Sequence, residues 1–271
     1  MTLSDTKSRV QLAYDAAADF YDHPVLSFWP YFGSRTVAIA GLKPGDAVLD
    51  VCCGAGASAI PAARLVWPGG SVLGVDLSAS LVNLARAKAS RLGLSNLEFR
   101  HADFASTPLP VGGFDAVLCV FGVFFFQDIS GAIRRMWRLL RPGGRLAITT
   151  WGPSLFEPAN TMFWDAVREE RPDLYRSFNP WESLTEPRQL RQAFTEAGVD
   201  AEEIRLERRD HAIESPDDWW TIVMGSGYRG IVEQLVPESR ERVRRACAQG
   251  LTGNGVADLR ASVVYGLARK P

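Results

Sequence analysis

The stretch Ala47-Val-Leu-Asp-Val-Cys-Cys-Gly-Ala-Gly56 decides how this chain folds. Its first seven residues are almost wholly apolar, which is typical of a strand buried on both faces of a parallel sheet. The Gly-Ala-Gly that follows allows a tight turn in which backbone can approach a ligand without a Cβ in the way. A helix rich in small residues then runs to about Val66. A buried strand that turns on glycines into a helix predicts the first unit of an α/β sheet.

The alternation of strand and helix continues to residue 152. Further apolar strands are predicted at 71–77, 114–121 and 145–151, and a more polar, edge-like strand at 97–103. Two helices, at 78–92 and 129–140, end at a glycine or a Pro-Gly turn. Two more strands, at 204–213 and 262–268, would bring the total to seven. The pattern predicts a Rossmann-like, doubly wound, mostly parallel sheet.

The rest of the chain predicts additions to this core within a single domain, residues 1–271. Residues 1–40 should form an N-terminal helical lid, and residues 153–186, rich in aromatic side chains and proline, an inserted cover on the substrate side of the sheet. Residues 187–271 should supply the last strands and further helices. Residues 41–152 then form the core of the domain.

Composition narrows the function classes. Lys and Arg number 30 against 31 Asp and Glu, so no basic field favours a nucleic acid or an anionic membrane as partner. No apolar run reaches the roughly 20 residues of a membrane-spanning helix, and the N-terminus lacks the apolar stretch of a secretion signal. The four cysteines show no zinc-ligand spacing, so we expect no metal site. We expect a cytoplasmic monomer or homodimer that acts on a small molecule.

Three features at predicted strand ends point to an adenosine-containing ligand. Gly54 and Gly56 form the turn after the first strand. Asp76 ends the second, where a carboxylate can accept hydrogen bonds from a ribose diol. Asp103 ends the third, where a carboxylate can accept one from an adenine amine while an apolar side chain packs on the base, either Phe104 or Leu77. Because the carboxyl ends of parallel strands share one edge, these features should line one cleft.

The glycine turn leaves a second cofactor class open. Gly54 to Ala59 also satisfies the dinucleotide fingerprint Gly-x-Gly-x-x-Gly/Ala, and Asp76 lies at about the expected distance of ~20 residues. A nicotinamide-dependent oxidoreductase is therefore an alternative. Two observations weigh against it: 46 residues precede the first strand, whereas dinucleotide folds usually begin near it, and Asp103 suits an adenine amine.

Four segments resemble the motifs of class I S-adenosylmethionine-dependent methyltransferases, namely Val48–Gly56, Gly74–Ser78, Ala102-Asp103 and the turn within Leu139–Ala147. With Tyr14–Asp22 at the front, the chain resembles the ubiquinone/menaquinone-methyltransferase-like group, often called type 11. It departs from the family at Ser58, where a third glycine often stands. The resemblance implies S-adenosylmethionine as cofactor and methyl transfer as activity, with residues 41–152 as the cofactor-binding core. A repurposed protein that binds this cofactor without methylating is a further alternative.

The resemblance also implies individual roles. Asp76 would hold the ribose hydroxyls, Asp103 the adenine amine and the Gly54–Gly56 loop the methionine moiety, while Tyr21 would contact the ligand from the lid. The full expected cofactor-binding set is Tyr21, Asp50, Cys53, Gly54, Gly56, Asp76, Leu77, Ala102, Asp103, Phe104, Val120 and Phe121.

Methyl transfer is an in-line displacement, so the enzyme mainly aligns the reacting atoms and excludes water. An acceptor that needs a general base would meet His211, just before a predicted helix start, or His23, on the lid; Tyr21 and Asp22 are alternatives. Aromatic residues after the fourth and fifth strands predict an apolar or aromatic acceptor pocket suited to a natural product or quinone-like molecule: Phe121, Phe124, Phe125, Phe126 and Trp151.

Overall fold

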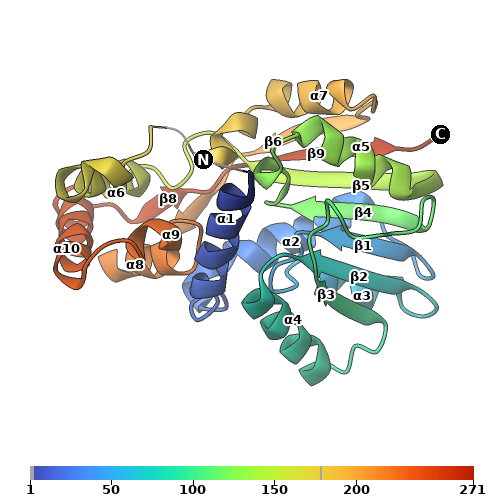
Figure 1. Ribbon diagram of the computed structural model, residues 1–271, viewed down its shortest axis with the longest axis horizontal. Coiled ribbons are helices and arrows are strands. Elements are labelled where there is room, and N and C mark those ends of the chain that lie inside the picture. The colour runs from blue at the N-terminus through green and yellow to red at the C-terminus, as the bar shows by residue number, and fades with distance from the viewer. Residues whose placement is uncertain (1–2, 178) are drawn as a thin grey trace.

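The computed structural model describes residues 3–177 and 179–271 and is built around one sheet (Figure 1). Its strands are β1 (Ala47–Val51), β2 (Ser71–Asp76), β3 (Leu97–His101), β4 (Phe114–Val120), β5 (Leu140–Trp151), β6 (Glu203–Glu207) and β9 (Val263–Arg269). They lie in the order β3-β2-β1-β4-β5-β9-β6. The first five pair in parallel, and β9 is antiparallel to both β5 and β6. This confirms the predicted seven-stranded, mostly parallel sheet.

Helices cover both faces of the sheet, as a doubly wound fold requires. One face carries α2 (Phe28–Ala40), α3 (Ala59–Val66) and α4 (Ala79–Arg91), whose small apolar residues pack on Val48, Val72 and Ala116. The other carries α5 (Ile129–Leu139) and α7 (Pro187–Glu196), which pack on Leu49, Val117 and Ile148. Since both faces are buried, the central strands need the apolar runs seen in the sequence.

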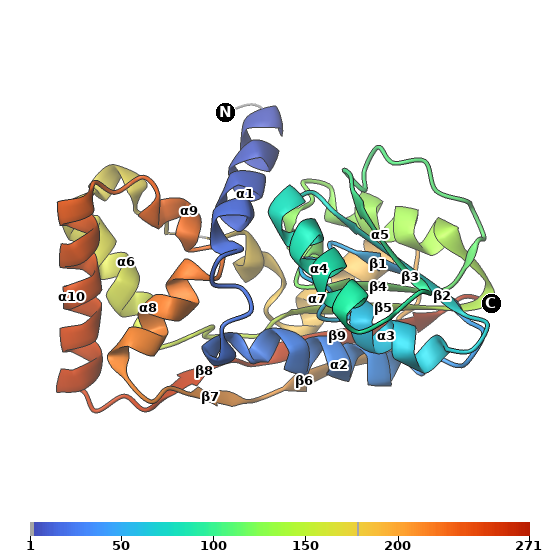
Figure 2. The same ribbon diagram turned by 90° about the horizontal axis from the view of Figure 1, so that it is seen from below.

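A second group of helices lies to one side of the sheet. It comprises α6 (Ala159–Glu170), α8 (Pro216–Met224), α9 (Arg229–Val232) and α10 (Pro237–Gly253). Helix α1 (Leu3–Ala17) lies between this group and the sheet (Figure 2). Among the described residues, no helix has both the length and the apolar composition that a membrane crossing needs.

The predicted cover, residues 153–186, joins these two parts. Its helix α6 packs along α10, and its last turn, η4 (Pro180–Leu184), contacts β5. The carbonyl of Leu184 accepts a hydrogen bond from Thr150 Oγ1 at 2.7 Å. Two one-turn helices complete the connections near the sheet edge: η1 (Pro24–Leu26) and η2 (Val123–Phe125); a third, η3 (Pro172–Leu174), follows α6.

Several predicted strand boundaries were wrong. Strand β3 ends at His101 rather than at residue 103, and β5 begins at Leu140 rather than at residue 145 because Leu140 already pairs with Phe114 of β4. The strand expected at 204–213 is split into β6 and β7 (Asp210–Ala212), and β7 pairs in a separate ladder with β8 (Asp258–Arg260). The split occurs because the last pair of β6 with β9 is Glu207 with Val263, where β9 begins. The first strand ends at Val51, two residues early, because Cys52 adopts a left-handed backbone conformation with φ 58°.

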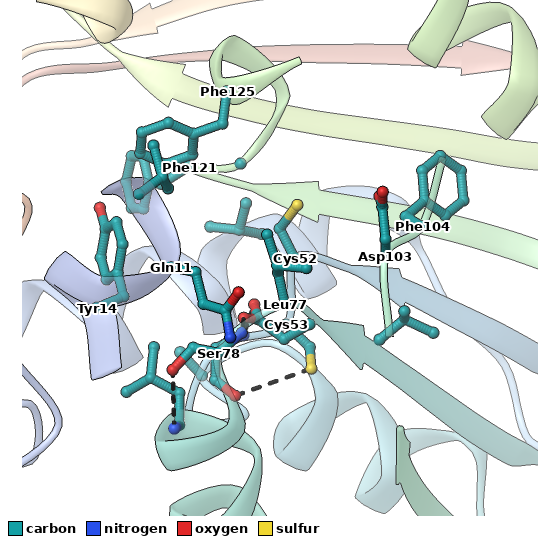
Figure 3. A pocket seen from close by; sticks show the side chains of 18 of the residues that line it. Gln11, Tyr14, Cys52, Cys53, Leu77, Ser78, Asp103, Phe104, Phe121 and Phe125 are labelled. Carbon is teal, nitrogen blue, oxygen red and sulfur yellow. Dashed lines mark hydrogen bonds between the residues drawn. The ribbon is translucent and has the colours of Figure 1, made fainter. Parts of the chain in front are cut away.

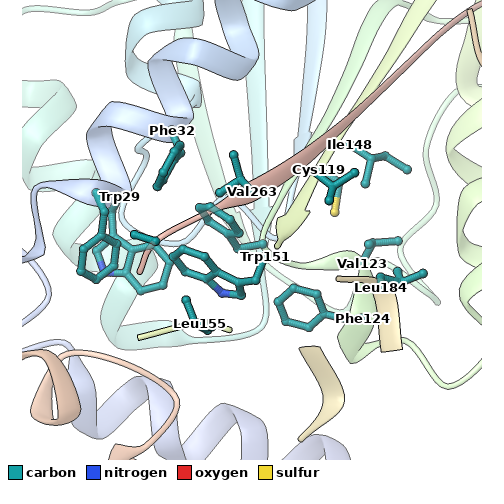
Figure 4. Close-up of a cluster of buried hydrophobic side chains, with 14 of the residues drawn as sticks. Trp29, Phe32, Cys119, Val123, Phe124, Ile148, Trp151, Leu155, Leu184 and Val263 are labelled. Atoms are coloured by element: carbon teal, nitrogen blue, oxygen red, sulfur yellow. The ribbon is translucent and has the colours of Figure 1, made fainter. Parts of the chain in front are cut away.

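Aromatic packing fixes the carboxyl edge of the sheet. Trp151, the last residue of β5, stacks on Phe121 with ring centroids 3.9 Å apart. The first turns of α2 bring Trp29 and Phe32 against the same two rings (Figure 4). Such pairs contribute about 0.5–1.5 kcal/mol each beyond the area they bury. Packed aromatic side chains therefore fix the carboxyl edge of the sheet, where ligands bind in this fold class.

Helix α2 also touches the glycine turn directly, and this contact generates a prediction. A Cβ on Gly33 would lie 2.4 Å from the carbonyl oxygen of Ala57, which is backbone and cannot swing away. We expect Gly33→Ala to lower the free energy of unfolding by about 1–3 kcal/mol, measured by urea denaturation. The control is Gly253→Ala in α10, where a Cβ meets nothing within 4 Å and the change should stay within about 1 kcal/mol. Equal effects of the two substitutions would contradict the contact.

Candidate active site

A cavity of about 1080 Å³, open solvent at its mouth included, lies at the carboxyl ends of β1, β2, β3 and β4. Helix α1 and η2 supply further walls (Figure 3). It brings together ten of the twelve residues expected to bind the cofactor: Tyr21, Cys53, Gly54, Asp76, Leu77, Ala102, Asp103, Phe104, Val120 and Phe121. The other two, Asp50 and Gly56, are not among the described residues that line it.

The glycine turn and the end of β2 are joined by a hydrogen bond. The Gly54 N–H donates to Asp76 Oδ2 at 2.8 Å, and the Ser78 N–H donates to Asp76 Oδ1 at 2.8 Å. A carboxylate has about four acceptor positions, so each oxygen can still accept a hydroxyl group. Burial raises the pKa of Asp76, although the backbone hydrogen bonds oppose this. Asp76 is thus fixed in place and retains acceptor capacity toward the cavity.

Glycine is required at the turn itself. Gly54 has φ +50°, a conformation that side chains disfavour, and a Cβ there would lie 3.2 Å from the Tyr21 hydroxyl. The ring of Tyr21 is stacked on Trp29 with centroids 5.2 Å apart. The indole N–H of Trp29 is buried and has no partner among the described residues. The turn therefore presents bare backbone beneath the Tyr21 hydroxyl, which suits close approach of a ligand.

Asp103 lines the cavity beyond the end of β3, and each of its carboxylate oxygens already has a partner. Its Oδ2 pairs with Lys7 Nζ of α1 at 2.7 Å, and its Oδ1 accepts from the Ala105 N–H at 2.9 Å. Burial alone would raise the pKa of Asp103, but the hydrogen bonds from Lys7 and Ala105 outweigh burial and lower it. An adenine amine would have to share this carboxylate with Lys7 or displace it.

Asp50 and Gly56 lie behind the turn. Asp50 is fully buried; its Oδ2 accepts from Ser58 Oγ at 2.7 Å, and its Oδ1 has no partner among the described residues. Burial raises the pKa of Asp50 to about 7. Gly56 has φ +85°, and a Cβ there would meet the Phe99 ring at 3.0 Å. Both residues shape the turn from the protein side, and Ser58, which lines the cavity, links Asp50 to it.

Four wall residues on α1 were missed by the prediction: Lys7, Val10, Gln11 and Tyr14. Their spacing, i, i+3, i+4 and i+7, puts them on one face of a helix. That periodicity was the available signal, but it does not by itself say which partner the face meets.

Polar contacts tie the lid to the core. Asp15 accepts from Ser78 Oγ at 2.6 Å and from the Ser80 N–H at 3.0 Å, at the start of α4. Asp22 pairs with Lys88 at 2.7 Å. With the Lys7–Asp103 pair, these contacts hold α1 over the cavity from both of its ends.

The two histidines proposed as bases lie elsewhere. His211 Nε2 is 2.7 Å from the carbonyl oxygen of Val25, and its ring packs edge to face on Phe28. Burial lowers the pKa of His211. His23 is exposed and its Nδ1 accepts from the Val25 N–H at 3.3 Å, at the start of η1. Neither is among the described residues that line the cavity, so a base role for them stays a prediction.

The predicted acceptor aromatics divide into two sets. Phe121, Phe125 and Phe126 line the cavity. Phe124 and Trp151 are buried in the aromatic core (Figure 4) and are not among the described lining residues. Phe124 and Phe125 end the one-turn helix η2 and Phe126 follows it in an extended conformation, so the three rings point in different directions and only Phe125 and Phe126 line the cavity.

Comparisons with known proteins agree with this geometry. The model of a family described as "Methyltransferase domain" matches residues 48–144. Aklanonic acid methyltransferase of Streptomyces sp. (strain C5) is 32% identical over 66% of this chain and 86% of its own length. Demethylmenaquinone methyltransferase of Listeria monocytogenes serotype 4a (strain HCC23) is 33% identical over 56% of this chain and 67% of its own.

Coverage of the relatives is uneven, since the chain spans between 49% and 86% of the first curated proteins that it matches. Among solved structures, the YcgJ protein of Bacillus subtilis has a TM-score of 0.57 at 20% identity, covering 89% of this chain and all of the other. That likeness concerns the fold alone.

The buried carboxyl of Asp50 generates a prediction about pH. Its raised pKa means that the folded protein holds the proton between the ordinary carboxyl value of 3.8 and about 7, while the unfolded chain does not. Stability is therefore greatest at low pH in this window and falls by about 1.4 kcal/mol per pH unit as the pH rises toward 7. We expect Asp50→Asn, which keeps the acceptor for Ser58, to remove that slope. Urea denaturation at a series of pH values between about 4.5 and 7 measures it. An unchanged slope would contradict the assignment.

Proposed function

The chain belongs to the class I S-adenosylmethionine-dependent methyltransferases of the ubiquinone/menaquinone-methyltransferase-like type, and we propose that it methylates a small apolar or aromatic acceptor. The observation that carries the proposal is the convergence of the Gly54 turn, Asp76 and Asp103 on one cavity that has aromatic residues at its other end. The two features that would also suit a nicotinamide cofactor are the glycine turn and the position of Asp76 after it, and the family to which the chain belongs does not favour that alternative.

The residues present fit S-adenosylmethionine. When bound, this cofactor supplies a methyl carbon activated by its bond to a sulfonium sulfur. Asp76 would accept the ribose hydroxyls, Asp103 the adenine amine, and the bare backbone at Gly54 would receive the methionine moiety under Tyr21. The partnerless indole N–H of Trp29 in the cavity wall is a further observation in favour of a ligand at this turn.

The chain's own residues would contribute alignment and exclusion of water. Phe121 and Phe125 at the end of β4 and in η2 would hold the acceptor in line with the methyl group. Helix α1, tied down by Asp15 and Lys7, would close the cavity over both ligands. Closure lowers the local dielectric and keeps water away from the activated methyl group.

The acceptor class rests on the lining and on the relatives. The relatives' names give an acid, aklanonic acid, and a quinone, demethylmenaquinone. An acceptor of that size with conjugated rings would pack on Phe121, Phe125 and Phe126. We propose that the protein, as a monomer or homodimer in the cytoplasm, methylates a small molecule of this kind in secondary or quinone metabolism. A nucleic acid is not proposed as acceptor because the net charge is −1.

A ligand-binding experiment tests this proposal against its alternatives. S-adenosylmethionine and S-adenosylhomocysteine at about 100 times Kd should each stabilise the protein by about 2.7 kcal/mol, several degrees in melting temperature. Asp76→Ala should abolish the shift, while Asp165→Ala, which removes an exposed carboxylate on α6, should retain it. Stabilisation by NAD(H) instead would favour the oxidoreductase. Binding without any methylated product across quinone and phenolic-acid acceptors would favour the repurposed protein.

A further inference from the structure

The cavity has two chemically different ends. Asp103 and Phe104 lie at one end, and Tyr14, Phe121 and Phe125 gather at the other, on the opposite side of Cys52 and Leu77 (Figure 3). Tyr14 comes from the lid helix, and its ring meets Phe125 edge to face with centroids 5.7 Å apart. If Asp103 receives the adenine, this second end is where an acceptor would lie.

Tyr14 carries a hydroxyl at that end, where Trp29, packed on Phe121, also carries an indole N–H. The described residues give the Tyr14 hydroxyl no hydrogen-bond partner. A Cβ on Gly227 would be 3.5 Å from it, and the Trp181 ring borders the same point. Burial, with smaller contributions from Asp76 and Cys52, raises the pKa of Tyr14, so the phenol keeps its proton and acts as a donor. A neutral donor in an apolar pocket favours an acceptor that carries oxygen, above all a charged oxygen.

No described residue of the cavity is placed to act as a base there. Asp76 accepts two backbone N–H groups, and Asp103 accepts one backbone N–H group and the Lys7 ammonium. Both carboxylates belong to the proposed adenosine site. Burial raises the pKa of Cys53, and that of Cys52 is raised by the Cys119 thiol and then by burial, so both thiols stay protonated. Tyr21 is likewise held neutral by burial. Lys7 is a cation.

We propose that the acceptor enters this cavity already ionised, as the conjugate base of an acidic phenol or enol, and that the Tyr14 hydroxyl donates a hydrogen bond to its oxygen. The inference rests on the proposed function and narrows its substrate class. The acceptor's proton goes to solvent before binding. The electron pair of the oxygen, or of the carbon conjugated to it, forms the bond to the methyl carbon while the carbon–sulfur pair returns to sulfur. When the oxygen is the nucleophile, no proton is left for the protein to remove; when a ring carbon is the nucleophile, its hydrogen leaves as a proton to solvent after the transfer.

Electrostatics favour the ionised acceptor. Desolvation disfavours an anion in this cavity, as the raised pKa of Tyr14 shows, but a sulfonium centre bound beside the acceptor opposes that cost, because opposite charges attract more strongly at low dielectric than in water. Lys7 lies at the other end, paired with Asp103 at 2.7 Å, so the attraction on an anionic acceptor comes from the bound sulfonium alone. A neutral alcohol or amine would gain no charge attraction to the sulfonium and would accept a weaker hydrogen bond from Tyr14.

The test uses 4-nitrophenol, whose absorbance distinguishes the phenol from the phenolate. The full chain is first saturated with sinefungin, an unreactive analogue with an amine in place of the sulfonium, and saturation is verified by thermal shift. The dye is then titrated by difference spectroscopy at a pH just below its solution pKa. We expect it to bind as the phenolate, with its pKa lowered. Tyr14→Phe should weaken binding about tenfold and reverse most of the pKa change.

Tyr31→Phe is the matched control, because the Tyr31 hydroxyl, on α2, donates to Glu207 of β6 and Tyr31 is not among the described lining residues. The change should leave both quantities unchanged. Binding of the neutral phenol, no binding to the sinefungin complex, or equal effects of the two substitutions would overturn the inference while leaving the methyltransferase proposal intact. Failure of sinefungin itself to stabilise the protein would instead contradict the proposed function on which the inference rests.

Discussion

The hydrogen bond from the Gly54 N–H to Asp76 Oδ2, 2.8 Å long, joins the two strand ends on which the site depends. It forms because β1 and β2 are parallel neighbours, paired from Ala47 with Ser71 to Val51 with Val75, so that the turn after one faces the last residue of the other. The parallel sheet in turn depends on helices that cover both faces. Disturbing that register would separate the turn from the carboxylate and remove the cofactor site as a unit.

The lid helix α1 forms one wall of the cavity and adds polar side chains to it. Helix α1 is joined to the core by side chains at its two ends, Lys7 with Asp103 and Asp15 with the start of α4. The Lys7–Asp103 ion pair is partly exposed and is worth about 0–1 kcal/mol, whereas Asp15 makes two partly buried hydrogen bonds. Because Lys7 holds the carboxylate proposed for the adenine amine, cofactor entry and lid position are coupled through one residue. The same helix carries Tyr14 to the acceptor end.

Sequence patterns predicted the sheet and the gathering of the glycine turn, Asp76 and Asp103 at one cavity, because both follow from local rules. Apolar runs indicate buried strands, and Gly54, Asp76 and Asp103 stand at strand ends whatever the neighbouring helices do. The acceptor side depends on tertiary packing and was predicted less well. Trp151 and Phe124 are as aromatic as Phe125, but the rings of α2 bury the first, and the one-turn helix η2 directs the second inward. Tyr14 was missed because its helical face becomes a cavity wall only when α1 lies over the sheet. The break between β6 and β7 was missed because it depends on where β9, about 50 residues later in the chain, begins.

A crystal structure of the protein with S-adenosylhomocysteine is the most direct test of the proposed cofactor site. We expect ribose hydroxyls on Asp76, the adenine amine on Asp103 with Lys7 turned away, and the thioether sulfur facing Tyr14, Phe121 and Phe125. A ligand with its sulfur directed away from those three rings, or an adenine bound at a site other than Asp103, would contradict it.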